Sequence, residues 1–586
     1  MTKRWRRTGA QLIWETLLGE GVHTVFGYPG GAILPAYDAM LDYPIRHVLV
    51  RHEQGATHMA DGYSRASGEV GVAVATSGPG ATNMVTGIAT AMLDSSPIVC
   101  VTGQVGSALI GTDAFQETDV TGVTLPITKH NYLVTEVDEI APALHEAFYV
   151  ARSGRPGPVL VDITKDAQQA FTATRPRLGK VDLPGYRPEP RPPESELQRA
   201  AELINRAERP VILAGHGILI SGAMGQVREL AERARIPIAM TLLGIGAIPA
   251  NHSLNMGMMG MHGESWVNQA IQEADLLLAL GMRFDDRVTG SLKTYAPNAA
   301  KIHIDIDPAE FNKNVRVDVA LAGDLSAVLA HLLPVIEARD RSEWLGSIRG
   351  FKGDTAVRDI QNLPDMGKLY AAHVIHDIWR MTGGKAIVTT DVGQHQMWEA
   401  QYYRHNEPRS LITSGGLGTM GFALPAAVGA KVARPDDEVW VIAGDGGFQM
   451  TMCELATIAQ ERLKLNVAII NNGYLGMVRQ WQEFFYDRRY AGTPILSPDF
   501  AALARSFGLG GEVVRSRQEV EGAVERARAD ERTVVLDFQV EKEDTVYPMV
   551  PTGARLQDMI RRPEQEADGD PESEEEPVAA GRTVEW

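Results

Sequence analysis

Short apolar runs that end on glycine or a small polar residue alternate with helical patterns along most of this chain. Residues 1–185 hold five such runs: HTVFGYPG, IRHVLV, GVAVATSGPG, PIVCVTGQ and GPVLVDIT. The stretches between them, such as QGATHMADGYSRA, have the apolar spacing of helices. Strands that alternate with helices favour βαβ units, so this alternation predicts an α/β fold with a parallel sheet.

The same alternation returns twice, which divides the chain into three units. The second unit has strands at RPVILAGHG, IPIAMTL, ADLLLALG and AKIHIDID, and the third at AIVTTDVG, EVWVIAGDG, LNVAIINN and RTVVLDFQV. The proline-rich stretch 184–196 and the weakly periodic stretch 337–366 are predicted to be linkers. We therefore predict three doubly wound parallel-sheet domains and a disordered acidic C-terminal tail. The predicted boundaries are 1–185, 195–340 and 367–560 for the domains and 563–586 for the tail.

Charge and cysteine content narrow the classes of function. The formal net charge is −18, and residues 563–586 contribute −8 of it through nine acidic residues and one arginine. Without a basic stripe, little would attract a nucleic-acid backbone, which argues against a nucleic-acid-binding protein. Cys100 and Cys453 lack the spacing of a disulfide framework or a metal site and fit a reducing compartment. No apolar run reaches the ~20 residues of a membrane span, and no export signal is evident, so we expect a cytoplasmic protein.

Two strands of the third unit end on small side chains that carry oxygen. Asp445 follows EVWVIAG, and Asn472 follows LNVAIIN 27 positions later, with a βαβ pattern between them. The carboxyl ends of parallel strands share one edge of a sheet, where ligands of open α/β folds bind. A carboxylate, an amide oxygen and a backbone carbonyl suit Mg²⁺, and a helix predicted to begin near Phe448 would point its N–H groups at phosphates. GDG or NNG alone is typical of an ordinary turn, but the pair at this spacing predicts a magnesium-bridged diphosphate.

A further candidate carboxylate lies in the first unit. Glu53 comes directly after the strand HVLVRH and at the start of a helical pattern. A lone glutamate in the first turn of a helix ordinarily complements the helix dipole, which is worth ~0.3–1 kcal/mol. Its position alone therefore favours a structural role.

These segments together resemble one enzyme family. The Asp445 and Asn472 pattern resembles the magnesium and diphosphate motif of thiamine diphosphate enzymes, and HEQGA stands where their acetohydroxyacid synthase (acetolactate synthase) branch carries a cofactor-activating glutamate. From about Thr8 to about Ile560 the chain resembles the large catalytic subunit of that branch. The matching segments are GYPGGAILPAYDAM, RHEQGATHMADGYSRASG, TSGPGATNMVTGIA, DAFQETD, SGRPGPVLVDITKD, GMMGMHG, GMRFDDRVTG, VGQHQMW, SGGLGTMGFALPAAVGA and VYPMVP.

The resemblance implies three cofactors: thiamine diphosphate, Mg²⁺ and FAD. Domain 1–185 would bind the pyrimidine ring, domain 195–340 FAD, and domain 367–560 the diphosphate with Mg²⁺. Asp445, Asn472 and the backbone carbonyl of Tyr474 match the family's metal ligands. The positions that match contacts with thiamine diphosphate are Tyr28, Gly30, Glu53, Pro79, Asn83, Val392, Gly393, Gln394, His395, Gly418, Met420, Gly446, Gly447, Leu475, Gly476 and Met477.

The resemblance also implies a reaction. Pyruvate would be decarboxylated on thiamine diphosphate, and the hydroxyethyl unit would pass to a second 2-keto acid. The products would be 2-acetolactate from pyruvate or 2-aceto-2-hydroxybutyrate from 2-ketobutyrate, for branched-chain amino-acid biosynthesis. Glu53 would activate the pyrimidine ring, and Met420 would hold the cofactor's two rings in a V shape.

Several residues match the family's substrate contacts. Arg287 matches the arginine near the acceptor carboxylate, which a guanidinium can bind with two hydrogen bonds. Trp481 matches the tryptophan that favours the extra methyl group of 2-ketobutyrate, a preference of ~1–3 kcal/mol. Phe115, Gln116 and Lys165 match residues that line the approach to the cofactor, although an exposed loop and a solvated lysine explain the same positions.

In the second unit, the local signals for a flavin are weak. AGHGI contains G-x-G without the full G-x-G-x-x-G pattern, and Asp305 in HIDID ends a strand as ribose-binding acids do. The resemblance adds GMMGMHG and RFDDR, which the flavin-free catabolic synthases lack, and so implies the biosynthetic kind in which FAD does no net redox work. The positions that match FAD contacts are Arg155, Gly215, Gly217, Thr241, Leu242, Gly260, Met261, His262, Gly263, Gly281, Arg283, Asp285, Arg287, Asp305, Ile306 and Asp324.

The family also implies partners and leaves alternatives. Because it binds the pyrimidine and the diphosphate with domains of different chains, we expect a homodimer or homotetramer, with a separately encoded small regulatory subunit. The alternatives are a pyruvate oxidase, a glyoxylate carboligase or a non-catalytic flavoprotein scaffold. Glu53 disfavours the carboligase, and Arg287 with Trp481 disfavours the oxidase. A scaffold without activity would have no physical reason to keep Glu53, Asp445, Asn472 and Met420 together.

Overall fold

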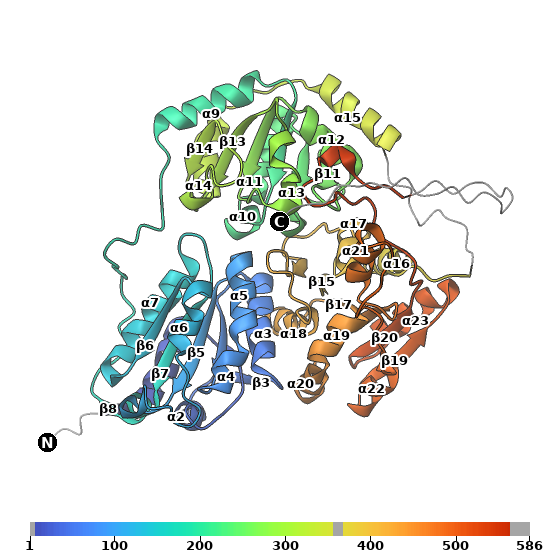
Figure 1. Cartoon of the computed structure of the whole chain (residues 1–586). Helices are drawn as coiled ribbons and strands as arrows, with labels where there is room; N and C mark the ends of the chain where they lie inside the picture. The colour runs from blue at the N-terminus through green and yellow to red at the C-terminus, as the bar shows by residue number, and fades with distance from the viewer. Residues whose placement is uncertain (1–5, 356–366, 563–586) are drawn as a thin grey trace.

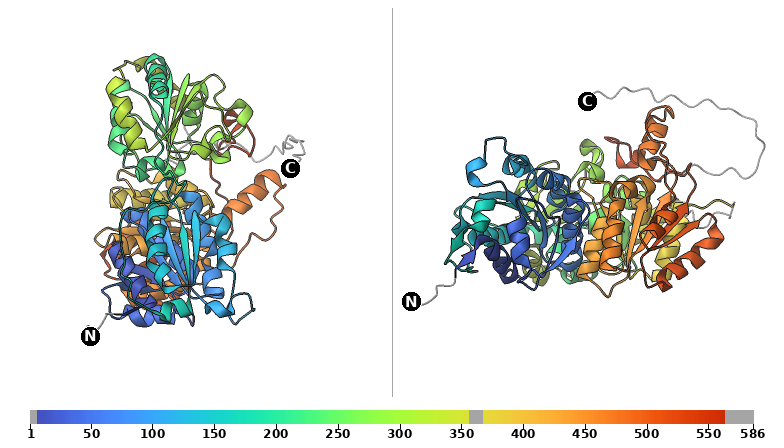
Figure 2. Two further views of the ribbon diagram at one scale, coloured as in Figure 1. Left: turned by 90° about the vertical axis from the view of Figure 1, so that its left-hand side faces the viewer. Right: turned by 90° about the horizontal axis from the view of Figure 1, so that it is seen from below.

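The chain folds around three six-stranded sheets. The computed structural model describes residues 6–355 and 367–562. All three sheets are parallel, and a short antiparallel pair, β1 (Arg7–Thr8) with β8 (Phe171–Thr172), lies beside the first. In Figure 1 the first and third units lie side by side with the middle unit above them, and the views of Figure 2 agree. The prediction of an α/β fold with three parallel sheets is confirmed.

The first unit has the strand order β3-β2-β4-β5-β7-β6. Its strands are β2 (Thr24–Gly27), β3 (Arg46–Leu49), β4 (Gly71–Ala75), β5 (Ile98–Gln104), β6 (His130–Val134) and β7 (Val159–Thr164). Its helices are α1 (Gly9–Gly19), α2 (Leu34–Met40), α3 (Glu53–Ser67), α4 (Pro79–Asn83), α5 (Val85–Asp94), α6 (Val120–Thr124), α7 (Ile140–Arg152) and α8 (Lys165–Gln169). Helix α1 starts with a capping box, in which Thr8 and Gln11 satisfy each other's backbone N–H groups.

The middle unit has the order β11-β10-β9-β12-β13-β14. Its strands are β9 (Pro210–Ala214), β10 (Ile238–Met240), β11 (Asn255–Met258), β12 (Leu276–Leu280), β13 (Ala300–Asp305) and β14 (Val319–Ala322). Its helices are α9 (Glu194–Arg206), α10 (Gly217–Ile220), α11 (Met224–Ala234), α12 (Ser265–Glu273), α13 (Asp286–Thr289), α14 (Leu325–Leu332) and α15 (Ser342–Thr355). Central strands such as β12 are apolar and buried along their whole length, because helices cover both faces of the sheet.

The third unit has the order β16-β15-β17-β18-β20-β19. Its strands are β15 (Ile387–Thr390), β16 (Leu411–Thr413), β17 (Val439–Gly444), β18 (Asn466–Asn471), β19 (Gly510–Val514) and β20 (Val534–Gln539). Its helices are α16 (Ala371–Thr382), α17 (Gln394–Tyr402), α18 (Ala423–Ala433), α19 (Asp445–Thr451), α20 (Leu455–Glu461), α21 (Gly476–Phe485), α22 (Phe500–Ser506) and α23 (Val520–Ala529). Counted along the chain, the strands of the first and third units both run 2-1-3-4-6-5, and those of the middle unit run 3-2-1-4-5-6.

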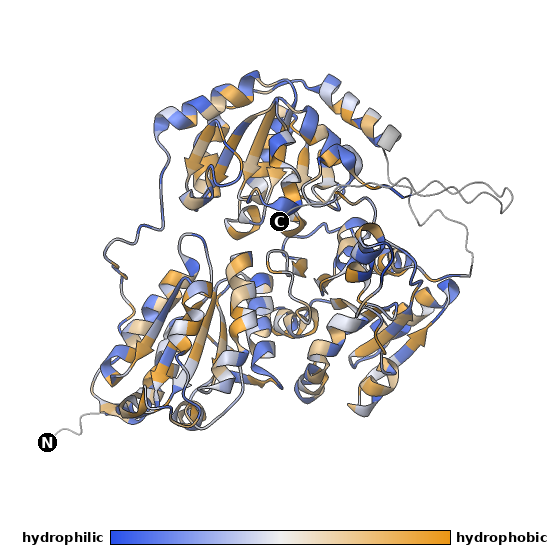
Figure 3. Ribbon diagram, viewed as in Figure 1, coloured by the Kyte–Doolittle hydropathy of each residue, from blue (hydrophilic) through white to orange (hydrophobic). Residues whose placement is uncertain are grey.

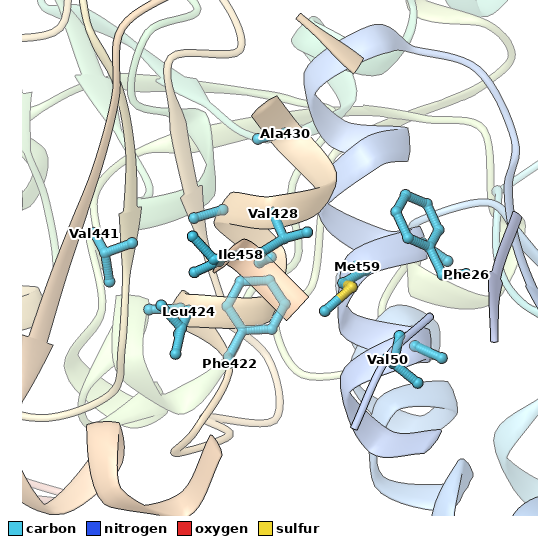
Figure 4. Packing of buried hydrophobic residues seen from close by; sticks show 14 of the residues in the cluster. Phe26, Val50, Met59, Phe422, Leu424, Val428, Ala430, Val441 and Ile458 are labelled. Carbon is cyan, nitrogen blue, oxygen red and sulfur yellow. The ribbon is translucent and has the colours of Figure 1, made fainter. Parts of the chain in front are cut away.

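Helices α3 and α18 join the first and third units through one continuous core. Met59 and Phe422 belong to a single buried cluster that extends into both sheets (Figure 4). The two helices approach so closely that a Cβ on Gly62 would collide with the carbonyl of Ala426, and one on Gly429 with the carbonyl of Met59. Small residues at the crossing therefore allow the first and third units to pack as one body.

The strands that the sequence predicts are confirmed, and the strands that it misses lie at sheet edges. The missed strands of the main sheets are β6, β11, β14, β16 and β19, each at one end of its sheet. Figure 3 shows the apolar residues concentrated on the strands, with polar residues on many helices. Edge strands have one neighbour instead of two, so they are short or mixed in polarity and their pattern is weaker.

The structure corrects one linker prediction. Part of the stretch 337–366 forms helix α15, in which Trp344 and Ile348 are buried and the Trp344 indole N–H donates to the carbonyl of Pro210 at 3.1 Å. The helix buries few side chains, so its apolar periodicity is faint. The predicted tail at 563–586 lies outside the described residues, and the predicted domain boundaries stay predictions.

Within residues 6–355 and 367–562, no helix combines the length and the apolar character that a bilayer crossing requires.

Candidate active site

The carboxyl ends of β15, β17 and β18 bring together the candidate diphosphate and metal residues. Val392 follows β15, Asp445 follows β17 and Asn472 follows β18. In the strand order 2-1-3-4-6-5, the connections from β15 and β17 leave in opposite directions, which is the switch point where open α/β sheets bind ligands. Helix α19 begins at Asp445 itself, so the sequence-based start near Phe448 is wrong by three residues.

A small cavity of about 50 Å³ lies between these strand ends. It is lined by the predicted diphosphate and metal residues of the third unit, with Gly418 as the exception. The predicted residues in its lining are Val392, Gly393, Gln394, His395, Met420, Asp445, Gly446, Gly447, Asn472, Tyr474, Leu475, Gly476 and Met477. The structure therefore brings these candidate residues of the third unit together around one cavity.

Asp445 and Asn472 have the chemistry of a magnesium site. Burial raises the pKa of Asp445 to about 6, while donation to its Oδ2 by the Ser497 hydroxyl at 3.0 Å and the Gly473 N–H at 3.1 Å opposes that shift. Asn472 Oδ1 accepts from the Tyr474 N–H at 3.0 Å, which turns the Tyr474 peptide toward the same cavity. A buried carboxylate gains from a bound cation. One carboxylate, one amide oxygen and one carbonyl leave coordination positions for phosphate oxygens, so the residues fit Mg²⁺.

His395 contributes an uncharged imidazole to the lining of this cavity. It is buried, and burial lowers its pKa to about 3, so the imidazole stays uncharged at neutral pH. Its ring packs over the backbone of Gly393 and Gly444, and its Nε2 has no hydrogen-bond partner among the described residues. A buried polar atom without a partner beside a cavity fits a ligand that supplies one, such as a phosphate oxygen.

Asp391 organises the turn around the cavity, and sequence reasoning missed it. Its carboxylate accepts from the N–H groups of Val392 at 2.9 Å, Gly421 at 2.9 and 3.0 Å and Ala423 at 3.2 Å. The residue thus ties the turn after β15 to the segment that carries Met420. An acid at the end of a predicted strand, the same signal that identified Asp445, could have found it.

A large cavity of about 1050 Å³ lies where the three units meet. It brings together most of the predicted FAD contacts; Gly215, Gly260 and Gly263 are not in its lining. The predicted residues that line it are Arg155, Gly217, Thr241, Leu242, Met261, His262, Gly281, Arg283, Asp285, Arg287, Asp305, Ile306 and Asp324 from the first two units, and Val392, Gly393, Gly418, Met420, Met477 and Trp481 from the third.

The inner end of the large cavity has the backbone geometry of a dinucleotide site. In the order 3-2-1-4-5-6, the switch point lies between β9 and β12, where Gly215 and Gly217 follow one strand and Gly281 the other. The Gly217 N–H donates to the Gly281 carbonyl at 2.9 Å, and a Cβ on Gly215 would collide with the same carbonyl. Glycines at the switch point let the chain approach a ligand closely, so the residues present fit a dinucleotide such as FAD.

Charged side chains are placed at several points of the cavity wall. Burial raises the pKa of Asp305 at the end of β13 to about 6. Arg155 comes from the first unit and pairs with Asp307 at 3.3 Å and Glu310 at 2.8 Å, which ties the first unit to the middle one. Asp324 is not a free carboxylate, because it caps α14 by accepting from the Ala327 N–H.

Arg287, Trp481 and Met420 share the wall of the large cavity. Arg287 is in α13, and more than half of its side chain is exposed; its Nη1 lies 3.3 Å from the Met261 sulfur. Trp481 projects from α21 with its ring centroid 5.2 Å from that of Phe485. An exposed guanidinium and an apolar ring around one space suit a small molecule with a carboxylate and a short alkyl group.

With the exception of Arg155, the first-unit candidates occupy a separate edge. They also follow parallel strands, but none of them lines either of the two cavities. These residues are Tyr28, Gly30, Glu53, Pro79, Asn83, Phe115, Gln116 and Lys165. Glu53 is 9% exposed, and its Oε2 accepts from the Asn83 Nδ2 at 2.9 Å. Phe115 is 90% exposed and Tyr28 40%, so in one chain this edge faces outward.

The candidate set thus divides into two groups. Those of the middle and third units, together with Arg155 of the first, converge on adjoining cavities that share Met420, and the other first-unit candidates stay apart. The described residues contain no cluster of three or more His, Cys, Asp or Glu side chains suited to a metal. A magnesium site here would depend on Asp445, Asn472 and a carbonyl, together with oxygens of a ligand.

Three models of the thiamine pyrophosphate enzyme family match the chain. The N-terminal TPP binding domain matches residues 7–123, the central domain 197–332 and the C-terminal TPP binding domain 391–538. The central span includes all six strands of the middle sheet, the first span includes β2 to β5 of the first sheet, and the third span begins just after β15 of the third sheet.

Curated relatives match nearly the whole chain. An acetolactate synthase of Mycobacterium bovis is 48% identical over 93% of this chain and 90% of its own length. The acetolactate synthase large subunit of Corynebacterium glutamicum is 49% identical over 94% of this chain and 90% of its own. The acetolactate synthase isozyme 2 large subunit of Escherichia coli is 45% identical over 94% and 99%, respectively.

Proposed function

Because the chain belongs to the acetolactate synthase large-subunit family of thiamine pyrophosphate enzymes, we propose that it joins two 2-keto acids with loss of CO₂. Pyruvate is the donor, and pyruvate or 2-ketobutyrate is the acceptor. The products are 2-acetolactate and 2-aceto-2-hydroxybutyrate, precursors of branched-chain amino acids. The observation that carries this proposal is that Met420 lines both cavities, so the Asp445 site adjoins the wall with Arg287 and Trp481.

The proposed cofactors are thiamine diphosphate, Mg²⁺ and FAD. Thiamine diphosphate, when bound, supplies the nucleophilic carbon that takes up pyruvate and allows CO₂ to leave. Asp445, Asn472 and the Tyr474 carbonyl would hold Mg²⁺ against the diphosphate, and His395 would pack beside it. The large cavity would hold FAD across the switch point of the middle sheet.

The acceptor would be oriented by two side chains of opposite character. Arg287 would bind its carboxylate, and its exposed guanidinium is available to do so. Trp481 would form the apolar wall for the alkyl group, which favours 2-ketobutyrate without excluding pyruvate. Met420 would pack against the cofactor between these groups and the diphosphate.

We propose that the complete site contains residues of two chains. Glu53 would contact the cofactor of a partner subunit, with Gln116 and Lys165 of the same edge lining the approach to it. The support is the division of the candidates: the first-unit edge is exposed and joins neither cavity of its own chain. A homodimer is then the smallest active unit, and a homotetramer would be a pair of such dimers.

The names of the relatives support one further partner. Two of them are called large subunits, so we propose that a small regulatory subunit binds this chain. We also propose that the enzyme acts in the cytoplasm, as a role in amino-acid biosynthesis implies.

The test of the activity is acetolactate formation from pyruvate, with thiamine diphosphate, Mg²⁺ and FAD each left out in turn. Product should require all three cofactors, and added 2-ketobutyrate should divert the product to acetohydroxybutyrate. Trp481→Leu should lower that diversion about tenfold, since one methylene in an apolar pocket is worth ~1–3 kcal/mol. Pyruvate consumption coupled to reduction of an acceptor, without acetolactate, would favour a pyruvate oxidase.

The two-chain site has its own test in mixed dimers. Glu53→Gln and Asp445→Asn should each inactivate a homodimer, but a dimer with one chain of each kind keeps one site in which both residues are intact. Refolding or co-expressing the two variants together should therefore recover roughly a quarter of wild-type activity, as random pairing predicts. If the mixed dimers are no more active than each variant alone, Glu53 serves the cofactor of its own chain.

A further inference from the structure

The loop 414–420 carries Met420 and lines the large cavity, yet its own sequence does little to hold it. It connects β16 to α18 and reads SGGLGTM, with three glycines among seven residues. Ser414, Gly415, Gly416, Leu417, Gly418 and Met420 all line the large cavity. Glycine-rich segments lose more conformational freedom on folding than others, so a fixed loop here needs contacts from outside.

Part of this support comes from the third unit, where Gln396 donates to the Ser414 carbonyl at 3.1 Å and Asp391 accepts from the Gly421 N–H just after the loop. The first unit adds a buried carboxylate and a hydroxyl group. Asp94, the last residue of α5, is 1% exposed. Its Oδ1 accepts from the Gly416 N–H at 2.6 Å, and its Oδ2 accepts from the Gly415 N–H at 3.2 Å. From one turn earlier in α5, the Thr90 hydroxyl lies 2.7 Å from the Thr419 hydroxyl. Helix α5 therefore makes hydrogen bonds near both ends of the loop.

Arg65 in the last turn of α3 holds this carboxylate in place. Its Nη2 donates to Asp94 Oδ2 at 2.8 Å, and its Nη1 donates to the Thr413 carbonyl, directly before the loop, at 2.7 Å. Its guanidinium also lies 5.3 Å from the ring centre of Phe422, just after the loop. The partner Asp61 raises the pKa of Arg65, as does Asp94 itself, so the guanidinium stays protonated. Hydrogen bonds between charged groups of this kind are shorter and stronger than neutral ones.

Asp61 provides an internal comparison. Its two carboxylate oxygens accept from Arg65 at 2.7 and 3.0 Å, and it is as buried as Asp94. The hydrogen bonds found for Asp61 connect it to Arg65, whereas those of Asp94 also reach the loop. The two acids therefore have the same ion-pair partner and are equally buried, but only Asp94 is hydrogen-bonded to loop 414–420.

We propose that Asp94, held by Arg65, is a positioning residue for thiamine diphosphate. It fixes loop 414–420 so that Met420 keeps its place in the walls of both cavities before the cofactor arrives. This role rests on the proposed function, since Met420 would be the residue that packs against the cofactor. A purely structural ion pair between the first and third units would give Asp61 and Asp94 the same effect on cofactor binding.

The test compares Asp94→Asn with Asp61→Asn, which make the same change in charge and size. Both variants should melt at a lower temperature than wild type, because each weakens a buried ion pair. In Asp94→Asn the amide group would face N–H donors, so the amides of loop 414–420 should exchange with deuterium faster in cofactor-free protein. The dissociation constant for thiamine diphosphate, measured by tryptophan fluorescence at saturating Mg²⁺, should rise about tenfold. Asp61→Asn should leave loop exchange and cofactor affinity within about twofold of wild type.

Equal changes in the two variants, or an Asp94→Asn loop as protected as in wild type, would overturn the proposal. If Asp94→Asn does not fold, Thr90→Val removes the contact with Thr419 and should raise the dissociation constant about threefold with faster exchange at Thr419; no change in either would also overturn it. Hydrogen exchange is measured without cofactor, so it tests the role of Asp94 even if the proposed function is wrong. Failure of the wild-type protein to bind thiamine diphosphate would refute the proposed function instead.

Discussion

The first and third units share a strand order and differ in what their strand ends carry. Both run 2-1-3-4-6-5, so each has a switch point at the same place in its sheet. In the third unit that edge is lined by glycines and small polar groups, which enclose a cavity. In the first unit it carries exposed aromatic side chains such as Tyr28 and Phe115 and the buried carboxylate of Glu53. The same topology thus gives the third unit an edge that surrounds a candidate cofactor cavity, here called the closed edge. It gives the first unit an edge that suits contact with another chain, here called the open edge.

The sharpest way to break this comparison is to change the carboxylate of the open edge. Glu53→Gln should lower the rate of acetolactate formation about a thousandfold, because it removes a group that acts on a proton of the cofactor. Thiamine diphosphate affinity should change only severalfold, since the diphosphate residues of the third unit remain. Steady-state rates and a cofactor titration measure the two effects. A loss of affinity as large as the loss of rate would contradict the division of labour between the edges.

The closed edge should respond in the opposite way. Asp445→Asn should weaken Mg²⁺-dependent binding of thiamine diphosphate roughly a hundredfold, because it removes the charged metal ligand. Ser497→Ala is the matched control: it removes the hydroxyl that donates to Asp445 at 3.0 Å but keeps the carboxylate, and should cost only about twofold. Calorimetric titration at fixed Mg²⁺ gives both values. Equal affinities for Asp445→Asn and wild type would rule out this metal site.

The exposed aromatic group of the open edge tests whether a partner covers it. Phe115→Ala should raise the dimer dissociation constant about tenfold, as truncation of a central interface residue does, with no loss of thermal stability in the monomer. Leu41 offers a control, since it is 83% exposed but lies between α2 and β3, at the opposite edge of the same sheet. Specific activity measured against enzyme concentration should shift for Phe115→Ala and stay unchanged for Leu41→Ala. Identical dilution curves for both would leave the open edge without a partner.

The smallest effect is expected where the two cavities meet. Met420→Leu nearly conserves volume, so the rate should fall about threefold with little change in cofactor affinity. Met420→Ala should lower the rate further, because it leaves a gap between the cofactor and the wall of the large cavity. The rates of the two variants at saturating cofactor show whether the shape of the side chain at position 420 matters or only its volume. Equal rates for Leu, Ala and Met would show that the residue is filler.

Much of the site could be predicted because its signals are local. Asp445 and Asn472 each follow an apolar strand, and Asp305 ends one. In a parallel sheet such positions lie at the carboxyl edge, where ligands bind. The same rule predicted the central strands of all three sheets. It failed at edge strands such as β16 and β19, where three- and five-residue segments with polar or glycine positions carry little periodicity.

Contacts between distant segments were beyond the reach of the sequence pattern. Asp94 and Gly415 are 321 positions apart, and Asp94 reads as an ordinary helix end until α5 is placed beside loop 414–420. Helix α15 was taken for a linker because its few buried residues, Trp344 and Ile348, pack against segments of the middle unit that are distant in the sequence. The separation of the first-unit candidates from the cavities likewise depends on how α3 and α18 pack, which no local pattern records.

Helix α3 has a consequence for how this protein can change over time. Glu53 is its first residue and Arg65 lies in its last turn, about 18 Å away along the axis at 1.5 Å per residue. In the proposed dimer, its N-terminal end serves the partner's cofactor and its C-terminal end holds the loop of its own chain. A substitution that shifts this helix therefore disturbs two catalytic centres in one mutational step. Natural selection should tolerate less drift in α3 than in other helices that are buried to the same degree.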